Sequence, residues 1–152
     1  MAGRFAATAV RWTRQGVWVT REAGGTVRVG LGPQSADALG EVTGLEAAAE
    51  PGSAVRAGQP FARATWEALK ITSADELYHT VWGHAEGTSD IALPFAAKLL
   101  EVNPAARAVV GDAAPEGWIA RLQPEAGADN HPSMLYEEPD PHMTEEERKE
   151  AW

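Results

Sequence analysis

Residues 8–32, "TAVRWTRQGVWVTREAGGTVRVGLG", carry the pattern that decides the fold class. Apolar and polar residues alternate around Val17 and Val19, and the alternation resumes in "TVRVGLG" after Gly24-Gly25. Alternation with a period of two turns one side of an extended chain toward a core, and two glycines permit the backbone angles of a tight hairpin turn. The stretch therefore predicts a β-hairpin.

The segments that follow have the pattern of short strands separated by turns. "SADALGEVTGL", residues 35–45, predicts a short helix with Ser35 as its cap and Gly40 as its end, leading into a strand. Further strands are predicted within residues 50–66, 91–103 and 116–124. We expect a mostly β (α+β) fold.

One stretch in the middle of the chain departs from the pattern of short strands separated by turns. In "SADELYHTVWGHAEGTSD", residues 73–90, Ser73 is a plausible cap and Gly83 a plausible end of one amphipathic helix. The apolar residues at helical spacing are Leu77, Tyr78, Val81 and Trp82. The pattern predicts a helical insertion at about residues 71–90.

Composition restricts the class of protein. The chain has 152 residues, of which 44% are apolar and 23% charged, and these values indicate one globular domain. No run approaches the roughly 20 apolar residues that cross a bilayer, and no secretory signal is recognisable, so a cytoplasmic protein without membrane contact is expected. The absence of cysteine excludes disulfides, thiolate metal ligands and thiol nucleophiles.

The charge is unevenly distributed along the chain. The net charge of −9 argues against a nucleic-acid partner, because phosphate binding needs clustered Lys and Arg. Nine acidic and two basic residues give residues 125–152 a charge of −7, which leaves −2 for the rest. We therefore expect a domain at residues 8–124 and an acidic, solvated extension at 125–152, with a C-terminal helix in "TEEERKEAW" capped by Thr144.

Four segments occur in an order that is fairly specific as a set. They are "RWTRQGVWV" (11–19), "VRVGLGPQSADALGEV" (27–42), "EPGSAVRAGQPFA" (50–62) and "LEVNPAARAVVGDAAPEGWIARL" (100–122). Together they resemble the glycine cleavage system H protein, the lipoyl carrier of that complex, over roughly residues 10–124. The resemblance implies a barrel-sandwich hybrid fold. It also implies a non-catalytic carrier that is lipoylated by a lipoate ligase or transferase and shuttles a bound intermediate between partner enzymes.

The family's chemistry resides in a lysine at the tip of a hairpin, in the motif Glu-Ser-Val-Lys-Ala. In "TWEALKI", residues 65–71, Glu67 and Lys70 keep the motif's three-residue spacing, whereas an ungapped count from Gly58 places Ala68 at the lysine position. Two hypotheses stay open: a carrier with lipoate on Lys70, which the resemblance predicts to lie at an exposed tip beside Glu67, and a scaffold module of the same fold that has lost its attachment site. Lys98 is a weaker candidate, because it is predicted to lie within a strand.

Other chemistry-bearing residues rank lower. His79 and His84, with Glu86 and Asp90, could ligate zinc or iron, but five-residue spacing does not align two histidines on one helix face. A small enzyme using these histidines is the third hypothesis. Among the tryptophans, Trp18 and Trp118 are expected in the core or at the barrel edge, and Trp66 and Trp82 on either side of Lys70.

Overall fold

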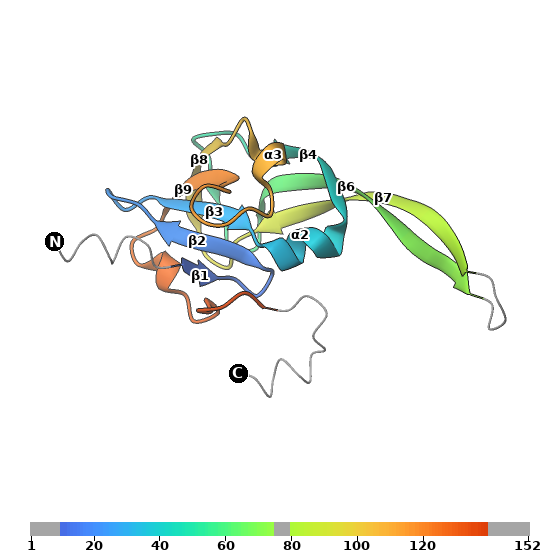
Figure 1. Ribbon diagram of the computed structural model, residues 1–152. Coiled ribbons are helices and arrows are strands. Elements are labelled where there is room, and N and C mark those ends of the chain that lie inside the picture. Colours follow the sequence, from blue (N-terminus) through green and yellow to red (C-terminus); the bar gives the residue numbers. More distant parts are fainter. Residues whose placement is uncertain (1–9, 75–79, 140–152) are drawn as a thin grey trace.

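A computed structural model describes residues 10–74 and 80–139, and the fold is mostly β (Figure 1). The strands are β1 (Val10–Trp12), β2 (Val17–Arg21), β3 (Val27–Leu31), β4 (Glu41–Ala47), β5 (Ala54–Val55), β6 (Pro60–Ala74), β7 (Thr80–Ala92), β8 (Ala97–Val102) and β9 (Ala120–Pro124). The helical elements are α2 (Pro33–Leu39), α3 (Ala106–Val109) and the 3₁₀ turn η1 (Ala128–Asn130). The predicted fold class is confirmed.

Two antiparallel sheets share one core. The larger has the strand order β1-β2-β3-β9-β8-β5, and the smaller has the order β4-β6-β7. Buried side chains from both sheets form one hydrophobic cluster, which includes Val29 and Leu122 from the larger sheet and Phe61 and Ala64 from the smaller. This arrangement agrees with the expected barrel-sandwich architecture.

The predicted hairpin at residues 8–32 is confirmed. Strands β2 and β3 pair from Val17↔Leu31 to Arg21↔Val27, and Gly24 and Gly25 between them have φ angles of 90° and 87°. These positive angles suit glycine, which has no Cβ to clash with the backbone.

Trp18 is buried with no exposed surface. Its cross-strand partner is Gly30, where a Cβ would come within 2.3 Å of the Trp18 ring. Gly30 therefore provides the space in which the indole lies, and the burial of Trp18 agrees with the expected position in the core or at the barrel edge.

The short helix α2 is confirmed, but its cap is not the predicted one. Gly32 is the N-cap and Pro33 opens the helix, whereas Ser35 lies within it. Two N–H groups at the start of α2 donate hydrogen bonds to the side chain of Glu138. Its Oε1 accepts from Gln34 N (3.0 Å) and from Ser35 N (3.4 Å). A carboxylate at this end also interacts favourably with the helix dipole. The sequence could not show this contact, since Glu138 is about a hundred residues away.

Residues beyond 124 also contribute to the core. Met134 is only 6% exposed and belongs to the hydrophobic cluster. Leu135 adds a bridge to the edge of β1, where Trp12 and Leu135 exchange two backbone hydrogen bonds of 2.6 Å. The expectation of a solvated appendage is wrong for this part of the chain, because Met134 and Leu135 pack on the body.

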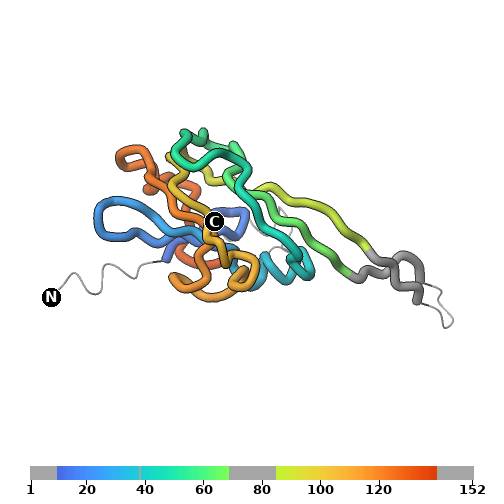
Figure 2. Tube along the Cα trace, turned by 90° about the horizontal axis from the view of Figure 1, so that it is seen from above, coloured from blue at the N-terminus to red at the C-terminus, as the bar shows by residue number. Residues whose placement is uncertain are grey.

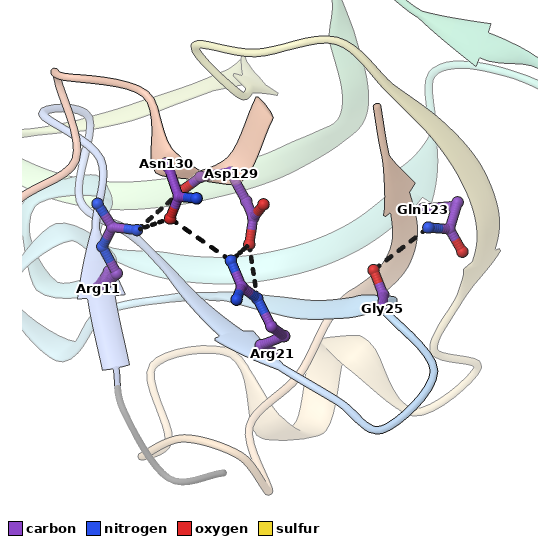
Figure 3. A network of polar contacts seen from close by, with 6 residues as sticks. All are labelled: Arg11, Arg21, Gly25, Gln123, Asp129 and Asn130. Atoms are coloured by element: carbon purple, nitrogen blue, oxygen red, sulfur yellow. Dashed lines mark hydrogen bonds and ion pairs between the residues drawn. The ribbon is translucent and has the colours of Figure 1, made fainter. Parts of the chain in front are cut away.

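A polar cluster joins the same segment to β1 and β2 (Figure 3). Asp129 is buried, and its Oδ2 accepts two hydrogen bonds from the Arg21 guanidinium, one of them at 2.9 Å from Nε. Arg11 donates to the Asp129 carbonyl and to Asn130 Oδ1, both at 3.0 Å. The division of the chain at residue 124 stays a prediction, and the expected C-terminal helix lies outside the described residues.

Candidate functional site on the projecting hairpin

The hairpin of β6 and β7 extends far beyond the sheet to which it belongs. Strand β4 pairs with β6 from Ala47↔Ala62 to Glu41↔Glu67, whereas β6 and β7 stay paired as far as Ala74↔Thr80. We call the two-stranded part beyond Glu67, residues 68–74 and 80–85, the arm. Figure 1 shows it projecting from the body, and Figure 2 shows β6 and β7 side by side where they leave it.

The predicted helical insertion is wrong. Residues 73–74 and 80–90 lie in strands, and Gly83 is not a helix end but the cross-strand partner of Lys70. Thr80, Val81 and Thr88 are β-branched, and β-branched residues favour strands. Pairing with β6 outweighs the helical spacing of the apolar residues. Residues 75–79, at the centre of the predicted helix, lie outside the described residues.

Lys70 is in the arm, but not at a turn. It lies within β6 opposite Gly83, four residues before the strand ends at Ala74. The residues that join β6 to β7 are 75–79, "DELYH", and include no lysine. The expectation of a tip lysine is therefore wrong, and the Ala68 alternative does not lie at a turn either, because Ala68 pairs with Ala85.

Glu67 and Lys70 both lie within strand β6, and neither is at a turn. The two residues are three positions apart in the strand. Glu67 lies between Glu41 of β4 and Glu86 of β7 in the register. The expected grouping of Glu67 and Lys70 on one turn is not what the fold provides.

Trp66 anchors the root of the arm. Its Nε1 donates a hydrogen bond of 3.0 Å to Ser89 Oγ, and its ring lies over its cross-strand partner Gly87. A Cβ at Gly87 would come within 2.8 Å of the ring atom Cζ2. The indole is half-buried. Its contacts with Ser89 and Gly87 hold β6 against β7 at the place where the arm begins.

Gln15 attaches the loop before β2 to β7 near this root. Its Nε2 donates to the Asp90 carbonyl (3.1 Å), and its Oε1 accepts from Ala92 N (3.2 Å). A hollow of about 220 Å³ lies beside this contact. It is lined by Gln15, Leu31, Ser35, Leu39, Ser89, Asp90 and Ile91.

Comparison with known proteins accounts for this architecture. The family model described as glycine cleavage H-protein matches residues 10–147. The chain belongs to the glycine cleavage H-protein family. The match extends beyond residue 124, where the sequence resemblance ended, and it includes the packed segment around Met134. No curated protein is similar enough in sequence to count as a relative.

The other candidate residues are placed as follows in this H-protein family member. Lys98 lies within a strand, as predicted: it is the exposed second residue of β8, opposite Ala54 and Gln123. Trp118 is half-buried beneath the Arg28 guanidinium, which lies 5.5 Å from the ring centre. Both residues belong to the larger sheet or its margin and are remote in sequence from the arm.

The two candidate histidines fall largely outside the described part of the chain. The backbone of His84 lies in β7 opposite Leu69, but its side chain and all of His79 are outside the described part. Among the side chains that the structure describes, no group of three or more His, Asp or Glu is arranged to hold a metal ion. Within residues 10–74 and 80–139, no helix has the length and apolar character needed to cross a membrane.

Proposed function

We propose that this H-protein family member is a carrier that bears lipoate on Lys70 and delivers a bound intermediate to partner enzymes. The observation that carries the proposal is the location of Lys70 on the projecting arm, past the last residue pair with β4 and opposite a glycine. Lys98 lies on the body instead, in a sheet of six strands.

The chemistry fits a lysine in this position. The ε-amine forms an amide with the carboxyl group of lipoate, and the four-carbon stem adds reach to the attached chain. A group on a projecting ribbon samples a large volume around the body, which raises its effective concentration at each docked enzyme. A β-ribbon is open on both faces unless another layer covers it, so a ligase has room to approach.

A second candidate function is favoured by a different observation. Lys70 is held in a paired strand, whereas the family's lysine is at the tip of a hairpin, and the joining residues 75–79 contain no lysine. A ligase that recognises only a lysine at a turn would not find such a lysine between β6 and β7. This observation favours a binding or scaffold module that has kept the H-protein fold without the lipoyl group.

Intact mass separates the two functions. The chain is produced together with a lipoate ligase and lipoate, and its mass is compared with that of Lys70→Arg and Lys98→Arg variants. The carrier function predicts one added lipoyl group in the wild type and in Lys98→Arg, and none in Lys70→Arg. An unmodified wild type under conditions that lipoylate a known H protein would establish the scaffold function instead.

A further inference from the structure

Strand β7 is an edge of the smaller sheet. The strand order is β4-β6-β7, so among the described strands β7 has a neighbour on one side only. In an antiparallel pair, alternate residues of an edge strand direct their backbone N–H and C=O groups away from the paired strand. Such groups are able to bind a further strand.

Hydrogen bonds to Gln15 show which residues of β7 have outward-directed backbone groups. The Asp90 carbonyl accepts from Gln15 Nε2 at 3.1 Å, and Ala92 N donates to Gln15 Oε1 at 3.2 Å. Asp90 therefore directs its backbone away from β6. No register shift interrupts the pairing with β6 between Asp90 and the start of the arm. By alternation, Thr88 and Glu86 direct their N–H and C=O groups outward as well.

These two residues are open at the edge. Within residues 10–74 and 80–139, no hydrogen bond from outside the sheet reaches the backbone of Thr88 or Glu86. Both side chains are exposed, and in the same ranges the Glu86 carboxylate forms no ion pair. Two N–H groups and two C=O groups are thus available to another chain.

Gln15 occupies the place of one residue in a further strand. Its carboxamide contains an N–H donor and a C=O acceptor, as a backbone peptide group does, and both are used on β7. The loop before β2 provides this single amide and leaves the edge beyond it, at Thr88 and Glu86, uncovered within the described residues. A peptide that continued along β7 from this point would repeat the same type of contact.

A hollow beside the edge has room for a side chain of the added strand. The hollow of about 220 Å³ next to Gln15 is bordered by Ser89 of β7 and by the apolar Leu31, Leu39 and Ile91. Neighbouring residues of a strand belong to opposite faces, so a residue opposite Ser89 shares the face of Ser89 and not that of Thr88. An aliphatic side chain at that position suits the apolar lining.

The charges of the edge distinguish between possible occupants. Glu86 and Asp90 share one face of β7, with Thr88 between them. Two copies of this chain paired antiparallel through Thr88 would set Glu86 of each against Asp90 of the other, and like charges directly opposite are destabilising. Asp90 already has Arg63 as its partner, at 2.9 Å. Glu86 therefore favours a foreign strand with Lys or Arg opposite it.

We propose that the edge of β7 at residues 86–90 binds an extended segment of a partner protein as an added antiparallel strand. The segment has Lys or Arg opposite Glu86 and an aliphatic residue opposite Ser89. Main-chain hydrogen bonds to Thr88 and Glu86 provide affinity, and the two side chains fix the register. The inference does not depend on acylation of Lys70, and it holds for a carrier and for a scaffold module alike.

A labelled heptapeptide, Thr-Ser-Leu-Thr-Val-Lys-Thr, provides the probe. Its central Thr is designed to lie opposite Thr88, its Leu opposite Ser89 and its Lys opposite Glu86. Binding to the full chain is measured by fluorescence anisotropy at low ionic strength. Two further peptides differ only in the place of one N-methyl group: on the central Thr, whose N–H would bond to Thr88 O, or on Val, whose N–H would face solvent.

One protein variant and its control locate the site. Glu86→Lys reverses the charge at the proposed edge, whereas Glu41→Lys makes the same change at an exposed residue of β4, the opposite edge of the sheet. Sedimentation velocity of the free wild type measures self-association. Circular dichroism verifies that both variants are folded.

The proposal predicts binding of the unmethylated peptide by a monomeric wild type. Methylation of the central Thr should weaken binding about tenfold or more, because it removes a hydrogen bond and obstructs the approach of the strand, and methylation of Val should weaken it less than about threefold. Glu86→Lys should weaken binding about tenfold, and Glu41→Lys less than about threefold.

Four results would overturn the proposal. The first is the absence of peptide binding by the wild type. The second is equal weakening by the two methylated peptides, which indicates side-chain attraction without strand pairing. The third is equal weakening by the two charge variants, which indicates attraction to net charge alone. The fourth is a wild-type dimer that Glu86→Lys alters, which makes a second copy the occupant.

Discussion

Glu138 holds the beginning of helix α2, with its Oε1 3.0 Å from the backbone nitrogen of Gln34. The same oxygen is 3.4 Å from Ser35 N, so one carboxylate satisfies two N–H groups that have no partner within the helix. The segment that follows β9 therefore stabilises an element more than a hundred residues earlier in the chain.

Replacing this carboxylate should destabilise the fold. We expect Glu138→Ala to lower the free energy of unfolding by about 1 kcal/mol, as for the loss of other helix caps. The measurement is urea unfolding followed by circular dichroism. Glu137→Ala is the matched control, because Glu137 is exposed and adjacent, and it should change stability by less than about 0.5 kcal/mol. Equal effects of the two variants would show that the cap contributes nothing.

The buried residue of the same segment gives a larger expected effect. Met134→Ala removes a core side chain that is 6% exposed and should cost about 2 to 4 kcal/mol. Truncation after Gln123 should cost at least as much, in contrast to the expectation from charge alone that residues 125–152 are a solvated extension. Tyr136→Ala serves as the control, since Tyr136 is 83% exposed. A truncated protein with an unchanged melting temperature would refute the packing described for Met134.

A pair of glycine substitutions tests the anchor of the arm. In Gly87→Ala the new Cβ meets the Trp66 ring at 2.8 Å, so the ring must move and the fold should lose about 1 to 3 kcal/mol. In Gly44→Ala the nearest side-chain atom, Thr65 Cβ, is 3.7 Å away, so this strand substitution should be neutral or mildly stabilising. Thermal unfolding of both variants measures the difference, and a neutral Gly87→Ala would mean that Trp66 does not lie over this glycine.

Local sequence patterns predicted the elements that local physics determines. The alternation around Val17 and Val19 predicted the β2–β3 hairpin, and the segment that ends at Gly40 predicted the short helix α2. In both cases the residues that carry the pattern are the residues that form the element. Neither prediction required information about residues far away in the sequence.

The arm and the C-terminal packing depend on distant partners, and the sequence patterns failed there. The apolar residues Leu77, Tyr78, Val81 and Trp82 have helical spacing in the sequence, but residues 80–90 pair with β6 and form a strand. The β-branched Thr80, Val81 and Thr88 were signals in the sequence in favour of the strand. Met134 stands among prolines and acids, where no periodicity marked it as a core residue.

The proposed carrier function is tested most directly by locating the lipoyl group on the protein itself. The chain is lipoylated by a ligase with lipoate, digested, and its peptides are analysed by tandem mass spectrometry. The account predicts one lipoyl amide, on Lys70, at high occupancy, with Lys98 and Lys149 unmodified. An unmodified Lys70 beside a fully lipoylated H protein in the same reaction, or a lipoyl group on Lys98 or Lys149 instead, would contradict it.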